Sequence, residues 1–119
     1  MSTQEIADRL ATLCKTGEWE KAQKELYADD VVSIEPFATP AFEKETKGLE
    51  NVLEKGRKFD AMVEAMHNIT VSQPLVAGNA ISFKLDLDIT MKGRGQMNMN
   101  EICVYTVKDG KVVSEQFFM

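Results

Sequence analysis

The spacing of apolar residues changes near residue 66 and divides the chain into two halves. Before that point apolar residues recur every three or four positions, which is the spacing of amphipathic helices. After it apolar and polar residues alternate, which is the spacing of strands with one buried face. A run of helices followed by a run of strands predicts an α+β fold, and the length of 119 residues suits a single domain over 1–119.

Two helices are expected before the first strand. Ser2 stands three residues before Glu5, the spacing of a capping box, and Gly17 is a suitable residue to end the helix. A shorter helix follows, with Trp19, Ala22, Leu26 and Tyr27 on one face. Both helices therefore have an apolar face to bury.

A strand, "VVSIEPF", follows these helices and ends at Pro36. Residues 38–47 lack periodicity and contain a second proline, which predicts a loop. A third helix is expected from Leu49 to about Val63. One acid, Glu35, stands where a valine or threonine would suit a strand end better.

The second half predicts a four-stranded meander. Turns are expected at Gly78–Asn79, at 93–95 and at Asp109–Gly110, the last being a strong type I′ signal. Pro74 cannot donate a hydrogen bond to a neighbouring strand and marks an edge or a bulge. Alternation between 81 and 92 is regular, with these apolar residues on one face: Ile81, Phe83, Leu85, Leu87, Ile89 and Met91.

Composition excludes several classes of partner. The net charge of −5 is unsuited to nucleic acid and to an anionic membrane surface, and no stretch is long and apolar enough to cross a bilayer. Cys14 and Cys103 are far apart, and the chain has one histidine, so no metal site is expected. Two free thiols and a polar N-terminus without a signal peptide indicate a cytoplasmic protein.

The order of elements, together with "LYADDVVSIEP", a helix opening after Gly48 and the ending "VYTVKDGKVVSEQFF", resembles the nuclear transport factor 2-like superfamily. Within it the chain is most similar to the SnoaL-like group, which is related to ketosteroid isomerase, scytalone dehydratase and small polyketide cyclases. The resemblance implies a cystatin-like cone, in which a strongly curved antiparallel sheet wraps around three helices. It also implies a deep apolar pocket for a small hydrophobic molecule, no cofactor, and a homodimer formed through the outer face of the sheet.

The resemblance assigns a catalytic role to two residues. In the isomerase the general base is an acid directly before a proline at the end of the first strand, and Glu35–Pro36 matches that place. The isomerase's tyrosine and protonated aspartate align with Leu10 and Cys103, which cannot do the same work. His67 matches the histidine of the dehydratase, although that enzyme's helix-one acid falls near Lys15. Each mechanism is therefore only half represented.

The strand "MNMNEICVYTV" leaves two registers open. In one, Glu101 and Glu115 point inward with Glu35, and repulsion among three acids raises at least one pKa. In the other they lie in water, and Asn100 and Ile102 point inward. With the first register, the expected pocket-lining residues are Leu10, Trp19, Phe37, Met97, Met99, Glu101, Cys103, Glu115 and Phe117.

Two functions are compatible with these residues. The first is a cofactor-free isomerase, cyclase or dehydratase of a small apolar carbonyl compound, with Glu35 as general base and His67 as acid or hydrogen-bond donor. The second is a non-catalytic module that binds a small hydrophobic ligand or serves dimeric assembly. An apolar outer face that includes Ile102 and Val104 predicts the dimer. The sequence specifies neither the ligand nor the role of the 38–47 loop.

Overall fold

The computed structural model describes all 119 residues, which form three helices and seven strands. The helices are α1 (Thr3–Lys15), α2 (Trp19–Leu26) and α3 (Leu49–Met62). The strands are β1 (Tyr27–Ile34), β2 (Glu45–Lys47), β3 (Val63–Val71), β4 (Leu75–Ala77), β5 (Ala80–Met91), β6 (Gly95–Lys108) and β7 (Lys111–Phe118). The predicted order of helices and strands is confirmed, except that two short strands, β2 and β4, were not predicted as separate elements.

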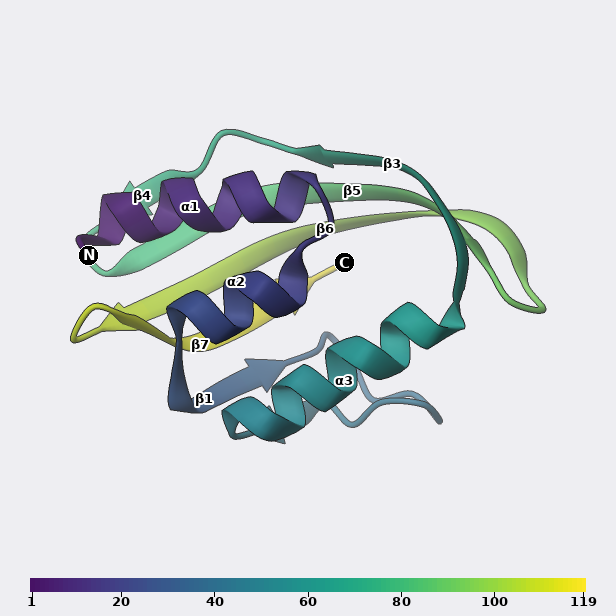
Figure 1. Cartoon of the computed structure of the whole chain (residues 1–119), viewed down its shortest axis with the longest axis horizontal. Helices are drawn as coiled ribbons and strands as arrows, with labels where there is room; N and C mark the ends of the chain where they lie inside the picture. Colours follow the sequence, from purple (N-terminus) through teal and green to yellow (C-terminus); the bar gives the residue numbers. More distant parts are fainter.

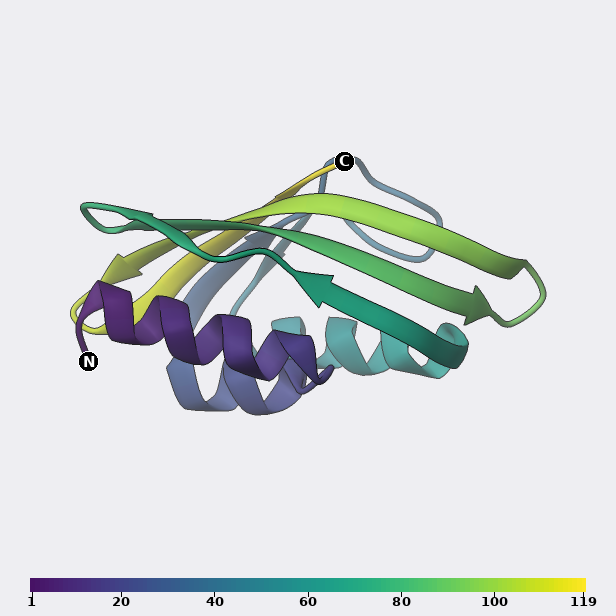
Figure 2. The same ribbon diagram turned by 90° about the horizontal axis from the view of Figure 1, so that it is seen from above.

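All strands belong to one sheet with the order β2-β1-β7-β6-β5-β3, and β4 also pairs with β5 (Figure 1). Neighbouring strands are antiparallel except β1 and β7, which run parallel. The long hairpin of β5 and β6 extends beyond the rest of the sheet, and all three helices lie on one side of the curved sheet (Figure 2). The α+β class is confirmed, and the curved sheet is not closed into a barrel.

The hydrophobic core lies between the helices and the inner face of the sheet. Ile6 and Leu10 of α1 and Val52 of α3 are almost completely buried. The regular alternation of β5 is confirmed, because all of its predicted inward residues are buried. Burying these side chains is the main force that holds the helices on the sheet.

Local signals place the ends of the elements as the sequence predicts. The Ser2 hydroxyl accepts a hydrogen bond from the Glu5 amide, and the Glu5 carboxylate accepts one from the Ser2 amide, so the capping box is present. The β6–β7 turn has φ values of 52° at Asp109 and 74° at Gly110. Positive φ at both central residues defines the type I′ turn, which matches the twist of the two strands.

The interpretation of 38–47 as loop throughout is wrong at its end. Glu45–Lys47 forms the short strand β2, which pairs with Val32–Ile34 of β1. Three residues are too few for an alternating pattern to be recognised in a sequence, and backbone pairing with the edge of β1 stabilises the strand. None of the three helices combines the length and the apolar composition needed to cross a membrane.

Candidate functional site

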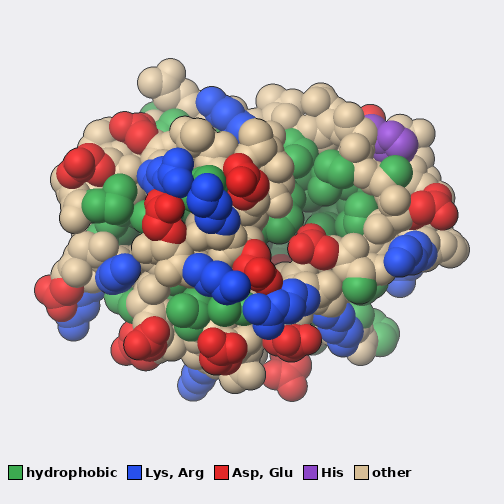
Figure 3. All heavy atoms as spheres, in the orientation of Figure 1, with side chains coloured by type: hydrophobic (Ala, Val, Ile, Leu, Met, Phe, Trp, Pro, Cys, Tyr) green, Lys and Arg blue, Asp and Glu red, His purple; other side chains and the backbone are tan.

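A cavity of about 590 Å³ lies between the helices and the inner face of the sheet. Its wall is mostly apolar, and Figure 3 shows a hollow containing hydrophobic side chains with acidic side chains near its edge. The sequence-predicted residues that line it are Leu10, Trp19, Phe37, Met97, Met99, Glu101, Glu115 and Phe117. Volumes of this order accommodate small organic molecules.

Cys103 was expected among these residues, and the structure places it elsewhere. Its side chain is fully buried within the hydrophobic core, where Cys103 pairs with Phe83 on one side and Phe117 on the other. Cys103 is therefore not among the residues that line the cavity. Burial also raises the pKa of the Cys103 thiol, which disfavours the thiolate that a nucleophile would need.

Glu35 lines the cavity directly after the end of β1. Its carboxylate accepts a hydrogen bond from the ammonium group of Lys55 on α3, with 2.9 Å between Oε1 and Nζ. The side chains are only 26% exposed at Glu35 and 13% exposed at Lys55. This partly buried ion pair fixes the direction of the Glu35 carboxylate more firmly than an exposed pair would.

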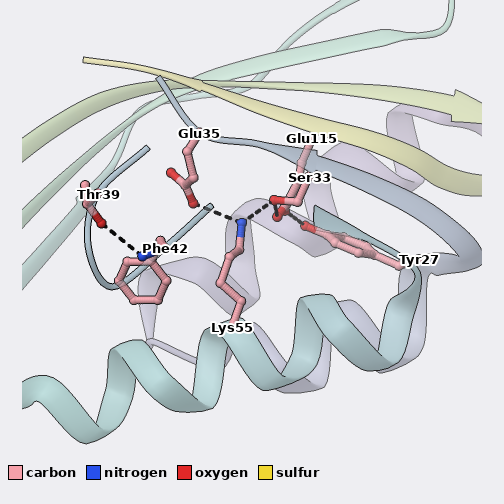
Figure 4. Close-up of polar contacts among 7 residues, drawn as sticks. All are labelled: Tyr27, Ser33, Glu35, Thr39, Phe42, Lys55 and Glu115. Atoms are coloured by element: carbon pink, nitrogen blue, oxygen red, sulfur yellow. Dashed lines mark hydrogen bonds and ion pairs between the residues drawn. The ribbon is translucent and has the colours of Figure 1, made fainter. Parts of the chain in front are cut away.

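Lys55 connects Glu35 to a second, deeper carboxyl group (Figure 4). Its ammonium also donates to the hydroxyl of Ser33. The Ser33 hydroxyl donates to Oε2 of Glu115 over 2.6 Å, and the Tyr27 hydroxyl donates to Oε1 of the same carboxyl. Five side chains from β1, α3 and β7 thus form one continuous polar network below the cavity.

Glu115 is the most buried acid of this network. It is only 3% exposed, and burial raises the pKa of its carboxyl above the usual value. Lys55 and the two hydroxyl donors act in the opposite direction, because they stabilise the carboxylate. Every oxygen of Glu115 therefore has a hydrogen-bond partner within the protein.

Glu101 also faces the cavity, which settles the register that the sequence leaves open. Glu101 is half-buried and lines the cavity, whereas Asn100 and Ile102 lie exposed on the other face of β6. Burial raises the pKa of Glu101 to about 7, and the charges of Glu35 and Glu115 add to the increase. Burial is thus the main cause of the higher pKa of Glu101, and the repulsion expected among three inward acids acts in the same direction.

His67 is not brought together with Glu35. The residue is exposed and does not line the cavity, and its Nε2 lies 2.6 Å from the hydroxyl oxygen of Thr90. A shift in the pairing of β3 with β5 between Met66 and Asn68 interrupts the alternation on which the prediction rested. A bulge of this kind turns the side chain away from the face that regular alternation predicts.

Sequence reasoning missed Tyr27, Ser33 and Lys55 as parts of this site. Two of them had a detectable signal. Ser33 and Glu35 are two positions apart in an extended segment, so their side chains point to the same face of the sheet. Lys55 follows the buried Val52 by three positions, which places it on the apolar face of α3. A lysine on an apolar helix face opposite an inward-pointing acid predicts a buried ion pair.

No group of three or more histidine, cysteine, aspartate or glutamate residues is close enough to hold a metal ion. Burial raises the pKa of the Cys14 thiol to about 12, so the thiol form dominates at neutral pH. The charged groups and hydroxyls that line the cavity include carboxyls, the ammonium group of Lys55, the guanidinium group of Arg94 and the hydroxyl of Tyr27.

A model of the SnoaL-like domain matches residues 1–119. A structure from Mesorhizobium loti, described both as a candidate SnoaL-like polyketide cyclase and as a carbohydrate phosphatase, is 31% identical, with a TM-score of 0.92 over 100% of both chains. A cystatin-like protein from Xanthomonas campestris is 19% identical, with a TM-score of 0.83 over 99% of this chain and 90% of the other. A candidate polyketide cyclase from Streptomyces antibioticus is 18% identical, with a TM-score of 0.74 over 99% and 91%.

No curated protein matches the sequence. The two structures below 20% identity show only that the fold is shared. The domain model and the structure from Mesorhizobium loti both extend over the whole chain, in agreement with the resemblance seen in the sequence. The chain therefore belongs to the SnoaL-like family.

Proposed function

We propose that the protein is a cofactor-free enzyme that moves a proton on a small, mostly apolar carbonyl compound, as in isomerisation, cyclisation or dehydration. The observation that carries the proposal is the Glu35 carboxylate, oriented by Lys55 at the wall of a mostly apolar cavity. Glu35 removes a proton from the carbon beside the carbonyl group, which leaves an enolate. The same carboxyl then returns the proton to another atom of the substrate.

Lys55 supports this chemistry from the opposite side of the ion pair. Its ammonium group also bonds to Ser33, so the positive charge keeps a partner when Glu35 turns toward a substrate. A fixed positive charge beside the cavity stabilises the negative charge that develops on an enolate oxygen.

The ion pair itself favours a second candidate, which is binding without catalysis. Lys55 occupies an oxygen of Glu35 at 2.9 Å, so this oxygen is less available to accept a proton from a substrate. The cavity would then hold a small hydrophobic ligand, and the network would only stabilise its wall. One experiment separates the two candidates.

The experiment follows exchange of carbon-bound hydrogen for deuterium in D₂O by NMR, with a panel of small lipophilic ketones, while thermal shifts report binding. Glu35→Gln keeps the size of the side chain and removes the base, so exchange should fall by about a hundredfold or more while binding persists. Glu50→Gln, at an exposed position outside the cavity, should leave both unchanged. Binding without any exchange in the unmodified protein would support the second candidate.

We also propose that the protein is a homodimer that pairs through the outer face of the sheet. Ile102 is 42% exposed and Phe118 is 49% exposed, and the two are paired on neighbouring strands. A partner covering them would remove adjacent apolar surface from water.

The cytoplasm is the proposed compartment, and two observations support it. Cys14 and Cys103 are both free thiols. Both are also buried, where they are shielded from oxidants. Free thiols persist in a reducing compartment.

A further inference from the structure

The three carboxyl groups of the cavity differ in their hydrogen-bond and ion-pair partners. Glu35 is paired with Lys55, and Glu115 accepts hydrogen bonds from Tyr27 and Ser33. Glu101 has neither a hydrogen bond nor an ion pair with any other residue, although it lines the cavity. A half-buried carboxyl without a partner in the protein is available to a group that enters from outside.

The surroundings of Glu101 are apolar and aromatic. Glu101 pairs with Leu85 on β5, and Met99 is the preceding inward residue of β6. On the other side, Phe117 pairs with Cys103, the next inward residue of β6, so the ring is a diagonal neighbour of Glu101. Diagonal neighbours on one face of a sheet are within reach when one side chain is aromatic.

Aromatic rings are concentrated on this cavity. Of the nine aromatic residues in the chain, seven line it: Trp19, Tyr27, Phe37, Phe42, Phe59, Tyr105 and Phe117. The protein's own lysine already uses one of these rings, because Nζ of Lys55 lies 5.7 Å from the centroid of Phe117. Aromatic faces attract cations, and the attraction is stronger where water is excluded.

Among the acids of the cavity, Glu101 is the one without a positively charged or hydrogen-bonding partner. Lys55 is engaged by Glu35 and Ser33. Arg94 also lines the cavity, but it is exposed on the turn between β5 and β6 and makes no ion pair. An entering cation would therefore meet one free carboxyl and several ring faces, while an entering anion would meet three acids.

We propose that the cavity binds an alkylammonium group, with the positive nitrogen against Glu101 and its apolar substituents against the aromatic wall. The proposal concerns the charge of the ligand, so it is independent of whether Glu35 transfers a proton. In this proposal the carboxylate of Glu101 is the counter-ion of the ligand, and the ring of Phe117 makes a cation–π contact with it. A carbonyl compound that enters this cavity would then carry an amino group at one end.

Two ligands of nearly equal shape test the charge. Choline carries a permanent positive charge, and 3,3-dimethylbutan-1-ol has the same outline with a carbon in place of the nitrogen. Binding is measured by NMR titration at pH 6 and pH 8. Choline should bind at least about tenfold more tightly than the neutral alcohol at pH 8, because only choline gains from a carboxylate and ring faces.

The affinity for choline should also change with pH. Choline does not titrate, whereas Glu101, with a pKa of about 7, is mostly ionised at pH 8 and mostly protonated at pH 6. The fraction of carboxylate therefore changes about tenfold, and so should the affinity. Glu35, Glu115 and Lys55 face the same space and influence this titration, so the assignment to Glu101 needs a variant.

Glu101→Gln should lower the affinity for choline to within about twofold of the neutral alcohol and remove its pH dependence. Glu64→Gln, at an exposed position of β3, should leave both as they are. Phe117→Leu should lower the affinity for choline about threefold or more and keep its pH dependence. Equal binding of the two ligands at pH 8, tighter choline binding at pH 6, no choline binding at all, or a pH dependence that survives Glu101→Gln would overturn the proposal.

Discussion

Replacing Glu101 with glutamine should stabilise the protein at neutral and alkaline pH and leave it unchanged in acid. In the folded protein the pKa of Glu101 rises from its ordinary 4.5 to about 7, mainly because burial disfavours the charge. Between these two values the unfolded chain ionises Glu101 and the folded protein does not, so rising pH favours unfolding. Each pH unit is worth about 1.4 kcal/mol, which gives a total cost of about 3 kcal/mol above pH 7.

Urea unfolding at pH 4 and pH 8 measures this difference directly. The free energy of unfolding of Glu101→Gln should exceed that of the unmodified protein by about 3 kcal/mol at pH 8 and should be equal to it at pH 4. Glu64→Gln removes the same charge from an exposed position and should change stability by less than about 0.5 kcal/mol at either pH. A Glu101→Gln difference that is the same at both pH values would refute the reasoning.

Three further variants test the network and the outer face. Lys55→Met removes the ammonium partner of Glu35 and should lower the free energy of unfolding by about 1–3 kcal/mol in urea titrations; an unchanged value would show that the ion pair is not stabilising. Tyr27→Phe removes one of the two hydroxyl donors to buried Glu115 and should cost about 1–3 kcal/mol in the same assay, whereas no cost would mean that Glu115 finds another donor. Ile102→Glu places a charge on the proposed dimer face and should convert a dimer into a folded monomer in light scattering, and an unmodified protein that is already monomeric would contradict the dimer.

The architecture could be predicted from the sequence because each element carries its own local signal. Alternation over 81–91 selects both the strand and its buried face, and Asp109–Gly110 fixes the turn that follows β6. These signals depend on neighbouring residues only, which is why the order and most of the bounds are confirmed. The short strand β2 was not predicted, because it is stabilised by pairing with β1, which is a tertiary contact.

The candidate site was predicted less completely, since side-chain direction depends on features that a sequence does not reveal. His67 is two positions before Ile69, so regular alternation would point both side chains to the same face. A bulge of one residue between them is enough to make that prediction wrong. Cys103 has the inward direction that was expected, yet it is fully buried in the core and does not line the cavity. Alternation along a strand predicts which face of the sheet a side chain is on, and it does not predict how deeply the side chain is buried.

The polar network connects the two candidate functions of the cavity. Transfer of a proton to Glu35 removes the negative charge that faces Lys55, and a buried ammonium group left without an acceptor would cost several kcal/mol, of order 3–5. Here Lys55 retains Ser33, whose hydroxyl is in turn bonded to Glu115. The second acid therefore lowers the cost of freeing the first. In a protein that only binds ligands, a buried acid behind Ser33 would bring a desolvation cost without this benefit.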